Sequence, residues 1–134
     1  MPNEFRFFLL CHGVESVEHV PGAVLRGVVN SIVQLENEAT PLFAVVGAIV
    51  APSMSNKALD MMVWRLDRTG ERQTIPGYVG TPLILPKCLG PQVMQYSFAL
   101  PTPTKGIYGA ELFDRDGAFG KREALLATYM FGVE

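Results

Sequence analysis

The stretch that decides the fold runs from Pro91 to Gly117, PQVMQYSFALPTPTKGIYGAELFDRDG. Two apolar rows recur in it with a period of two residues: Met94, Tyr96, Phe98 and Leu100, and then Tyr108, Ala110 and Leu112. This alternation is what a strand needs when one of its sides faces a core. Pro101 and Pro103 lie between the rows and lack backbone donors, so they end the first strand. The stretch therefore predicts two strands closed by a turn at Asp114–Gly117. We expect Tyr96, Phe98 and Leu112 to be buried, and we expect Gln95, Ser97 and Glu111 to lie on the opposite face.

Similar patterns extend in both directions from this pair. They predict further strands over residues 5–12, 23–35, 42–50, 57–67, 71–74, 81–85 and 122–133. The segments 23–35 and 122–133 also suit a helix in part, but their valine, isoleucine and aromatic content favours strands. Gly27 and the pair Asn30-Ser31 indicate a bulge or a break in the first of them. In the strand 57–67 we expect Met62, Trp64 and Leu66 to point inward. About eight strands at this spacing predict an all-β fold, a single antiparallel β-sandwich domain over residues 1–134.

Composition excludes several classes of function. Of the 134 residues 49% are hydrophobic and only 18% are charged, against about 25% charged in an average globular domain. The net charge is −2 and the basic residues are scattered, so no electrostatic footprint for nucleic acid is present. No apolar run approaches the ~20 residues of a membrane span. The first residues lack the positive start of a signal peptide, and we expect a cytoplasmic protein.

Cysteine and histidine positions do not form a metal or catalytic pattern. Cys11 lies in an apolar strand and Cys88 lies near a proline and glycine corner, so both are expected to be ordinary thiols. His12 and His19 lack the paired ligand spacing of a zinc site. Neighbouring strand residues point to opposite faces, so Cys11 and His12 cannot act together as a nucleophile and base. We expect a non-enzymatic protein without a cofactor or a metal ion.

Two binding functions remain as alternatives. One is a C2-like module that binds calcium or a membrane surface: Asp114 and Asp116 have the look of a calcium loop, and Asp67 and Glu111 are candidates for the same end of the sandwich. Calcium needs 6–8 oxygen ligands from more than one loop, whereas Asp-Gly turns also arise from backbone conformation alone. A small apolar ligand is the other alternative, in a pocket near Trp64 lined by methionines: Met54, Met61, Met62 and Met94. Methionines of this kind also fill irregular cores.

The landmarks along the chain resemble those of a known family. They are Leu9–Val14, Gly27–Asn30 followed by Ile32, Pro41–Val46, Trp64–Gly70, Gly106–Tyr108, Leu112 and Asp114–Gly117. Together they resemble a family of small bacterial proteins known only as a domain of unknown function. The resemblance implies an immunoglobulin-like or C2-like β-sandwich and brings no catalytic residues. This chain departs from the family by its methionine and proline content between residues 51 and 91.

Three strands are apolar on both faces, which a single core cannot accommodate. In residues 42–50 one face has Leu42, Ala44, Val46 and Val50, and the other has Phe43, Val45 and Ile49. In residues 125–133 one face has Tyr129, Phe131 and Val133, and the other has Leu126 and Met130. In residues 5–11 one face has Phe5, Phe7 and Leu9, and the other has Phe8 and Leu10. A monomer tolerates an apolar patch of roughly 300–600 Å². We therefore expect a homo-oligomer or a protein partner at an interface formed by Phe43, Val45, Ile49, Tyr129, Phe131 and Val133.

Overall fold

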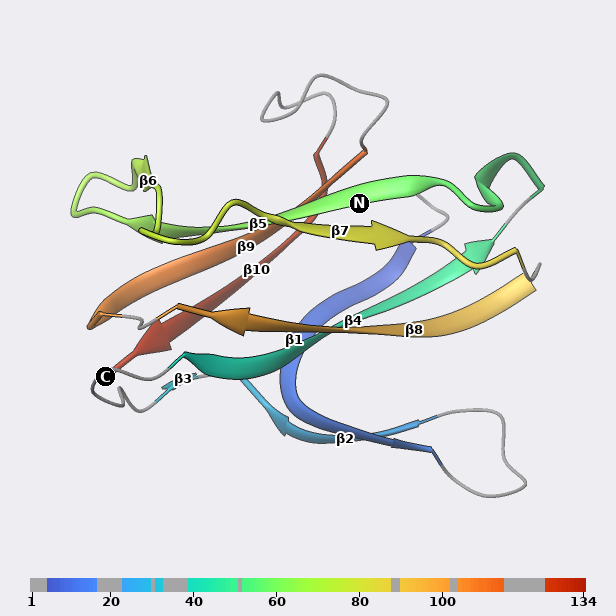
Figure 1. Ribbon diagram of the computed structural model, residues 1–134, viewed down its shortest axis with the longest axis horizontal. Helices are drawn as coiled ribbons and strands as arrows, with labels where there is room; N and C mark the ends of the chain where they lie inside the picture. Colours follow the sequence, from blue (N-terminus) through green and yellow to red (C-terminus); the bar gives the residue numbers. More distant parts are fainter. Residues whose placement is uncertain are drawn as a thin grey trace.

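The computed structural model describes residues 5–16, 23–29, 31–32, 39–50, 52–87, 90–101, 104–114 and 125–134. They form two sheets that face each other (Figure 1). Sheet A has the order β2-β1-β4-β8, and sheet B has the order β3-β10-β9-β5-β6, with β7 also paired to β5. The prediction of an all-β antiparallel sandwich is confirmed. Within the described residues, no helix is long and apolar enough to cross a membrane.

The strands of sheet A are β1 (Phe5–Ser16), β2 (Ala23–Val28), β4 (Thr40–Val50) and β8 (Gly90–Leu100). Those of sheet B are β3 (Ser31–Ile32), β5 (Ala58–Leu66), β6 (Arg72–Gln73), β7 (Thr81–Ile84), β9 (Gly106–Asp114) and β10 (Leu125–Val133). A single 3-10 turn, η1 (Pro52–Met54), joins β4 to β5 among the described residues. The predicted break in the segment 23–35 is real, because β2 ends just after Gly27, whose φ is +60°, and β3 follows separately.

The core lies between the inner faces of the two sheets. It contains completely buried side chains from both, among them Leu10, Leu42, Leu59, Leu83, Leu100 and Leu112. Tyr108 and Phe131 stack within it with ring centroids 5.5 Å apart. The core therefore joins strands that lie far apart in the sequence.

The opening pair of strands has the predicted faces. Along β8, Met94 and Leu100 are buried and Tyr96 and Phe98 are half-buried, while the alternate positions Val93, Gln95, Ser97 and Ala99 are exposed. Along β9, Tyr108, Ala110 and Leu112 are all buried. Glu111 lies on the other face as predicted, but it too is buried. The turn expected after Asp114 lies outside the described residues, as do His19, Cys88 and Asp116.

Two strands were assigned the wrong face. In β5 the register with β9 places Leu59, Met61 and Val63 on the inner face with Ala110 and Leu112. Met62, Trp64 and Leu66 lie on the opposite face with Glu111, where Met62 is nevertheless buried and Trp64 half-buried. In β10 the inner row is Ala127, Tyr129, Phe131 and Val133, although the last three were expected at the outer surface. Both strands are apolar on both sides, so alternation alone does not identify the inner face.

A bulge corrects the prediction for the first strand. The pairing of β1 with β4 shifts between Phe5 and Phe7. Because a bulge inserts one extra residue, it reverses the faces on one side of itself. Phe5 is consequently opposite Ala48 and buried in the core, whereas Phe7 points outward. Beyond Cys11 the same strand leaves β4 and pairs with β2, and Figure 1 shows it bending there.

Candidate functional site

The outer side of sheet A carries an apolar surface, which we call the apolar face. Its members, read strand by strand, are Val28 from β2, Phe7, Leu9 and Cys11 from β1, Phe43, Val45, Gly47 and Ile49 from β4, and Val93, Gln95 and Ser97 from β8. None of these residues is charged. The first described charges lie at its margin, where Arg26 donates to Glu15 across 2.8 Å. An antiparallel sheet that meets water on one side normally carries polar side chains on that side.

Phe7 lies flat over Gly47 at the centre of this face. A Cβ atom added to Gly47 would lie only 2.2 Å from the ring of Phe7. The glycine therefore makes room for an aromatic ring on the outer side of the sheet. A large apolar ring held over the middle of a sheet is a feature of contact surfaces, because aromatic side chains contribute much of their energy.

Exposure along the face is uneven. Phe7 is 36% exposed, Val93 49% and Val28 51%. Cys11 and Val45 are fully buried although they point outward, and neither belongs to the core between the sheets. Burial raises the pKa of the Cys11 thiol, while its contact with the carbonyl oxygen of Gly13 acts in the other direction. On this face, buried side chains therefore lie between apolar side chains that are more exposed.

The outer side of sheet B differs because it carries charge. Arg72 of β6 donates two hydrogen bonds to the carboxylate of Glu111 on β9, from Nε over 2.5 Å and from a terminal nitrogen over 2.7 Å. The carboxylate is buried and the Arg72 side chain is about half exposed. The bond to Glu111 raises the pKa of Arg72. Ile107 and Met130 are exposed on this side, and they line a groove together with Leu66 and the charged residues Arg65, Asp67 and Arg68.

The predicted interface residues separate between the two sheets. Phe43, Val45 and Ile49 lie on the apolar face, with Val45 buried and the other two half-buried. Phe131 and Val133 are buried in the core and Tyr129 packs against it. The sequence predicts Phe7 in the first strand, which is apolar on both faces, but Phe7 is not among the predicted interface residues. One sequence feature does point to its position: Gly47 is a glycine inside a strand, which marks the close approach of another group, here the Phe7 ring.

Of the carboxylates of the calcium alternative, the structure describes Asp67, Glu111 and Asp114, and these three do not meet. Asp67 accepts hydrogen bonds from the backbone nitrogens of Thr69 and Glu71 and from the Thr69 hydroxyl. These bonds, that from Thr69 first, lower the pKa of Asp67. Asp114 lies beside Leu59 at the other end of β5 and pairs with Lys57 over 2.7 Å. In the described ranges no three histidine, cysteine, aspartate or glutamate residues gather as a metal site would require.

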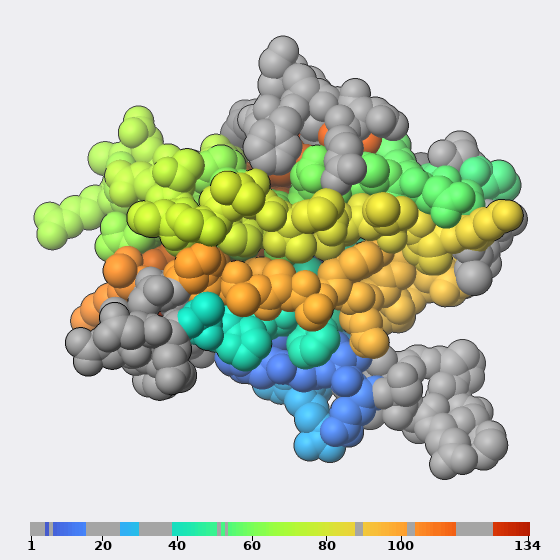
Figure 2. Space-filling view, in the orientation of Figure 1, coloured from blue at the N-terminus to red at the C-terminus, as the bar shows by residue number. Residues whose placement is uncertain are grey.

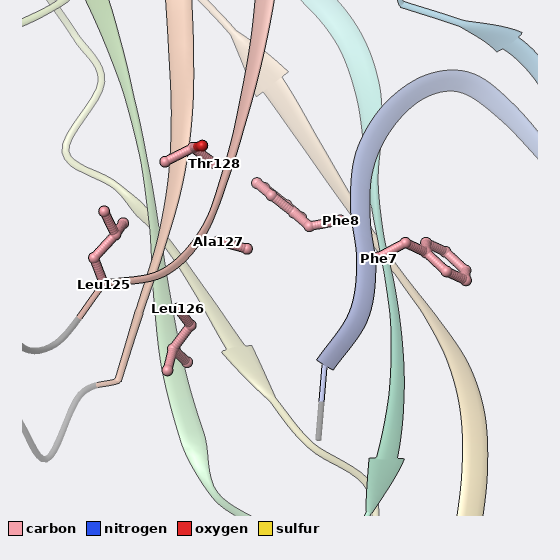
Figure 3. A pocket seen from close by; sticks show the side chains of 6 residues that line it. All are labelled: Phe7, Phe8, Leu125, Leu126, Ala127 and Thr128. Atoms are coloured by element: carbon pink, nitrogen blue, oxygen red, sulfur yellow. The ribbon is translucent and has the colours of Figure 1, made fainter. Parts of the chain in front are cut away.

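The methionines proposed to line a pocket are buried: Met54, Met61, Met62 and Met94. Trp64 is half-buried and packs against the core cluster. A groove of about 460 Å³ lies elsewhere, between the start of β1 and the start of β10. Figure 3 shows Phe8 pointing from β1 toward Ala127 and Thr128, while Phe7 points away on the far side of the strand. Another groove, of about 590 Å³, is lined by Arg65 and Leu66, which follow Trp64 in β5, and by Ile107 and Met130, but Trp64 itself lines neither groove.

Comparison with known proteins adds little to this picture. No family model and no curated protein matches the chain. Among solved structures, the chain is similar to a CARDB domain from Pyrococcus furiosus, solved in complex with di-metal ions, with 12% sequence identity and a TM-score of 0.40. The similarity covers 99% of this chain and 97% of that one. The sandwich architecture rests on the strands themselves, and the resemblance to a bacterial family stays a prediction.

Proposed function

We propose that this chain is a non-enzymatic β-sandwich that acts through protein–protein contact, and that the apolar face is its contact surface. The observation that supports the proposal is the apolar face, none of whose named residues is charged, with the Phe7 ring held over Gly47. A contiguous apolar surface on a folded chain marks a contact site more often than a solvated one. Partly exposed aromatic and aliphatic side chains at its centre are suited to become buried on association.

The size of the face limits the contact that it can form. β4 has 11 residues, which corresponds to a length of ~37 Å. Along this length only β1, β4 and β8 lie side by side, because β2 pairs with the part of β1 from Cys11 on. Three strands at their usual spacing cover ~14 Å, so this part of the face has a footprint of roughly 500 Å². A partner would have to cover most of the sheet to approach the ~800 Å² that each side contributes to a standard interface.

We assign a second copy of the chain as the partner. Two sheets pack face to face about 10 Å apart when their facing side chains are apolar. A face without charge can meet itself around a two-fold axis without opposing like charges. Lysine and glutamate at the centre would prevent this, and neither occurs there.

A charge placed on the face tests the proposal. Val28→Glu changes an exposed residue of the face, and Ile107→Glu makes the same change at a similarly exposed residue on the outer side of sheet B. Light scattering after size exclusion at tens of micromolar should show that Val28→Glu lowers the mass of the assembly and Ile107→Glu leaves it unchanged. An unchanged mass for Val28→Glu, with the fold preserved by circular dichroism, would contradict the proposed contact.

A further inference from the structure

β8 is the last strand of sheet A, and its outer edge has no partner strand among the described residues. Each of its 11 residues pairs with β4, from Gly90 opposite Val50 to Leu100 opposite Thr40, without a shift of register. The strand is therefore long and regular. Its free edge presents backbone donors and acceptors that another strand can pair with.

The usual devices that protect an edge are missing from most of β8. From Gln92 to Leu100 the strand has no proline, no charged residue and no bulge. Other edge strands of this molecule are different: β6 has two residues, and β7 has four, one of which is Pro82. Natural sheets avoid association by short strands, proline, lysine and bulges. The free edge of β8 is thus open to pairing.

Exposed apolar side chains accompany this edge. β7 lies beside β8 on the face of the molecule seen in Figure 2, and the Tyr96 hydroxyl donates to the Ile84 carbonyl oxygen over 2.8 Å. Val79 is 94% exposed and Ile84 is 58% exposed. Both belong to the segment next to β8, and Val93 of β8 itself is exposed. An approaching strand would cover apolar surface in addition to forming backbone hydrogen bonds.

We propose that β8 pairs in antiparallel fashion with β8 of a second copy, so that sheet A continues from one chain into the other. A two-fold pairing centred on Gln95, the middle residue of the strand, would place Gln95 opposite its own counterpart and Val93 opposite Ser97 of the second copy. A charged residue at position 95 would then meet a like charge, which destabilises cross-strand pairs; Gln95 is uncharged. The edge is distinct from the apolar face, and both contacts used together would give an assembly larger than a dimer.

Amide hydrogen exchange of β8 distinguishes edge pairing from contact through the face. In a strand paired on one side only, alternate amides point to the free edge and exchange quickly. Edge pairing should slow these alternate amides between residues 92 and 100 by at least about tenfold. Fast exchange at alternate positions in the wild-type assembly would overturn the edge pairing and leave the face contact intact.

Matched variants complete the test. Gln95→Lys introduces the charge that edge strands commonly use for protection, and Gln95→Thr changes the same exposed residue without a charge. Because Gln95 also lies on the apolar face, a lower mass of the lysine variant follows from the loss of either contact, and fast exchange restored at alternate amides is the result that reports on the edge. The threonine variant should change neither the mass nor the exchange. Slow exchange that persists after a loss of mass would overturn the proposal. Slow exchange in wild type together with no effect of Val28→Glu on mass would instead contradict the face contact.

Discussion

Gly47 shows how a single residue shapes the surface of sheet A. The ring of Phe7 occupies the space that a Cβ atom at residue 47 would fill. Glycine in a strand has an entropic cost of about 0.5–1 kcal/mol relative to alanine, so its presence here needs a compensating contact. The ring over the glycine is that contact, and it keeps an aromatic group on the outside of the sandwich.

We expect the effect of Gly47→Ala to depend on residue 7. In the wild-type chain the new methyl group would displace the Phe7 ring and lower the free energy of unfolding by about 1 kcal/mol. In a Phe7→Ala background the ring is absent, so the same change should raise it by about 0.5–1 kcal/mol through the unfolded state. Urea unfolding of the four proteins measures both values. Equal effects in the two backgrounds would contradict the packing of Phe7 on Gly47.

At the scale of strands, alternation predicted the fold where polar residues mark one face. In β8, Gln95 and Ser97 identify the outer side, and that assignment is confirmed. In β5 and β10 both faces are apolar, so the inner face is determined by the register of each strand with β9. The sequence of a single strand does not contain that register. The alternation of residues 5–11 does not indicate the bulge between Phe5 and Phe7. Half of the predicted interface was misplaced for the same reason, because it relied on the faces of β10.

Arg72 links strands across the outer side of sheet B. β6 pairs only with the end of β5, yet the Arg72 side chain reaches Glu111 on β9, which lies on the other side of β5. The ion pair therefore fixes the short return strand to the sheet. It also satisfies a carboxylate that would otherwise be buried without a partner.

Arg72→Met should destabilise the protein because it leaves the Glu111 carboxylate buried and unpaired. Such losses cost 3–5 kcal/mol for fully buried pairs. Since Arg72 is about half exposed, water compensates in part and we expect about 1–3 kcal/mol. Adding Glu111→Gln removes the charge and should recover part of the loss. Urea unfolding of both single variants and the double variant gives the coupling; additivity within about 0.5 kcal/mol would contradict the role of the pair.

At the scale of the whole molecule, tyrosine hydroxyls connect the two sheets at both sides of the sandwich. Tyr96 of sheet A donates to the Ile84 carbonyl oxygen of β7. On the other side, Tyr129 of sheet B donates to the carbonyl oxygen of Val29, the residue after β2. The first bond joins β8 of sheet A to β7 of sheet B, and the second joins β10 of sheet B to the residue that follows β2 of sheet A. They hold the sandwich closed beyond the contacts of its core.

We expect Tyr96→Phe and Tyr129→Phe each to lower the free energy of unfolding by about 0.5–1.5 kcal/mol. The sites lie on opposite sides, so the two losses should add within about 0.5 kcal/mol. Burial raises the pKa of both phenols. Because a raised pKa favours the neutral phenol in the folded state, this contribution is complete below the unfolded value of ~10 and is lost as the pH rises through the folded value. Urea unfolding at neutral and alkaline pH should therefore show a smaller alkaline loss in the double variant than in wild type. An equal alkaline loss in both proteins would mean that these two hydroxyls do not join the sheets.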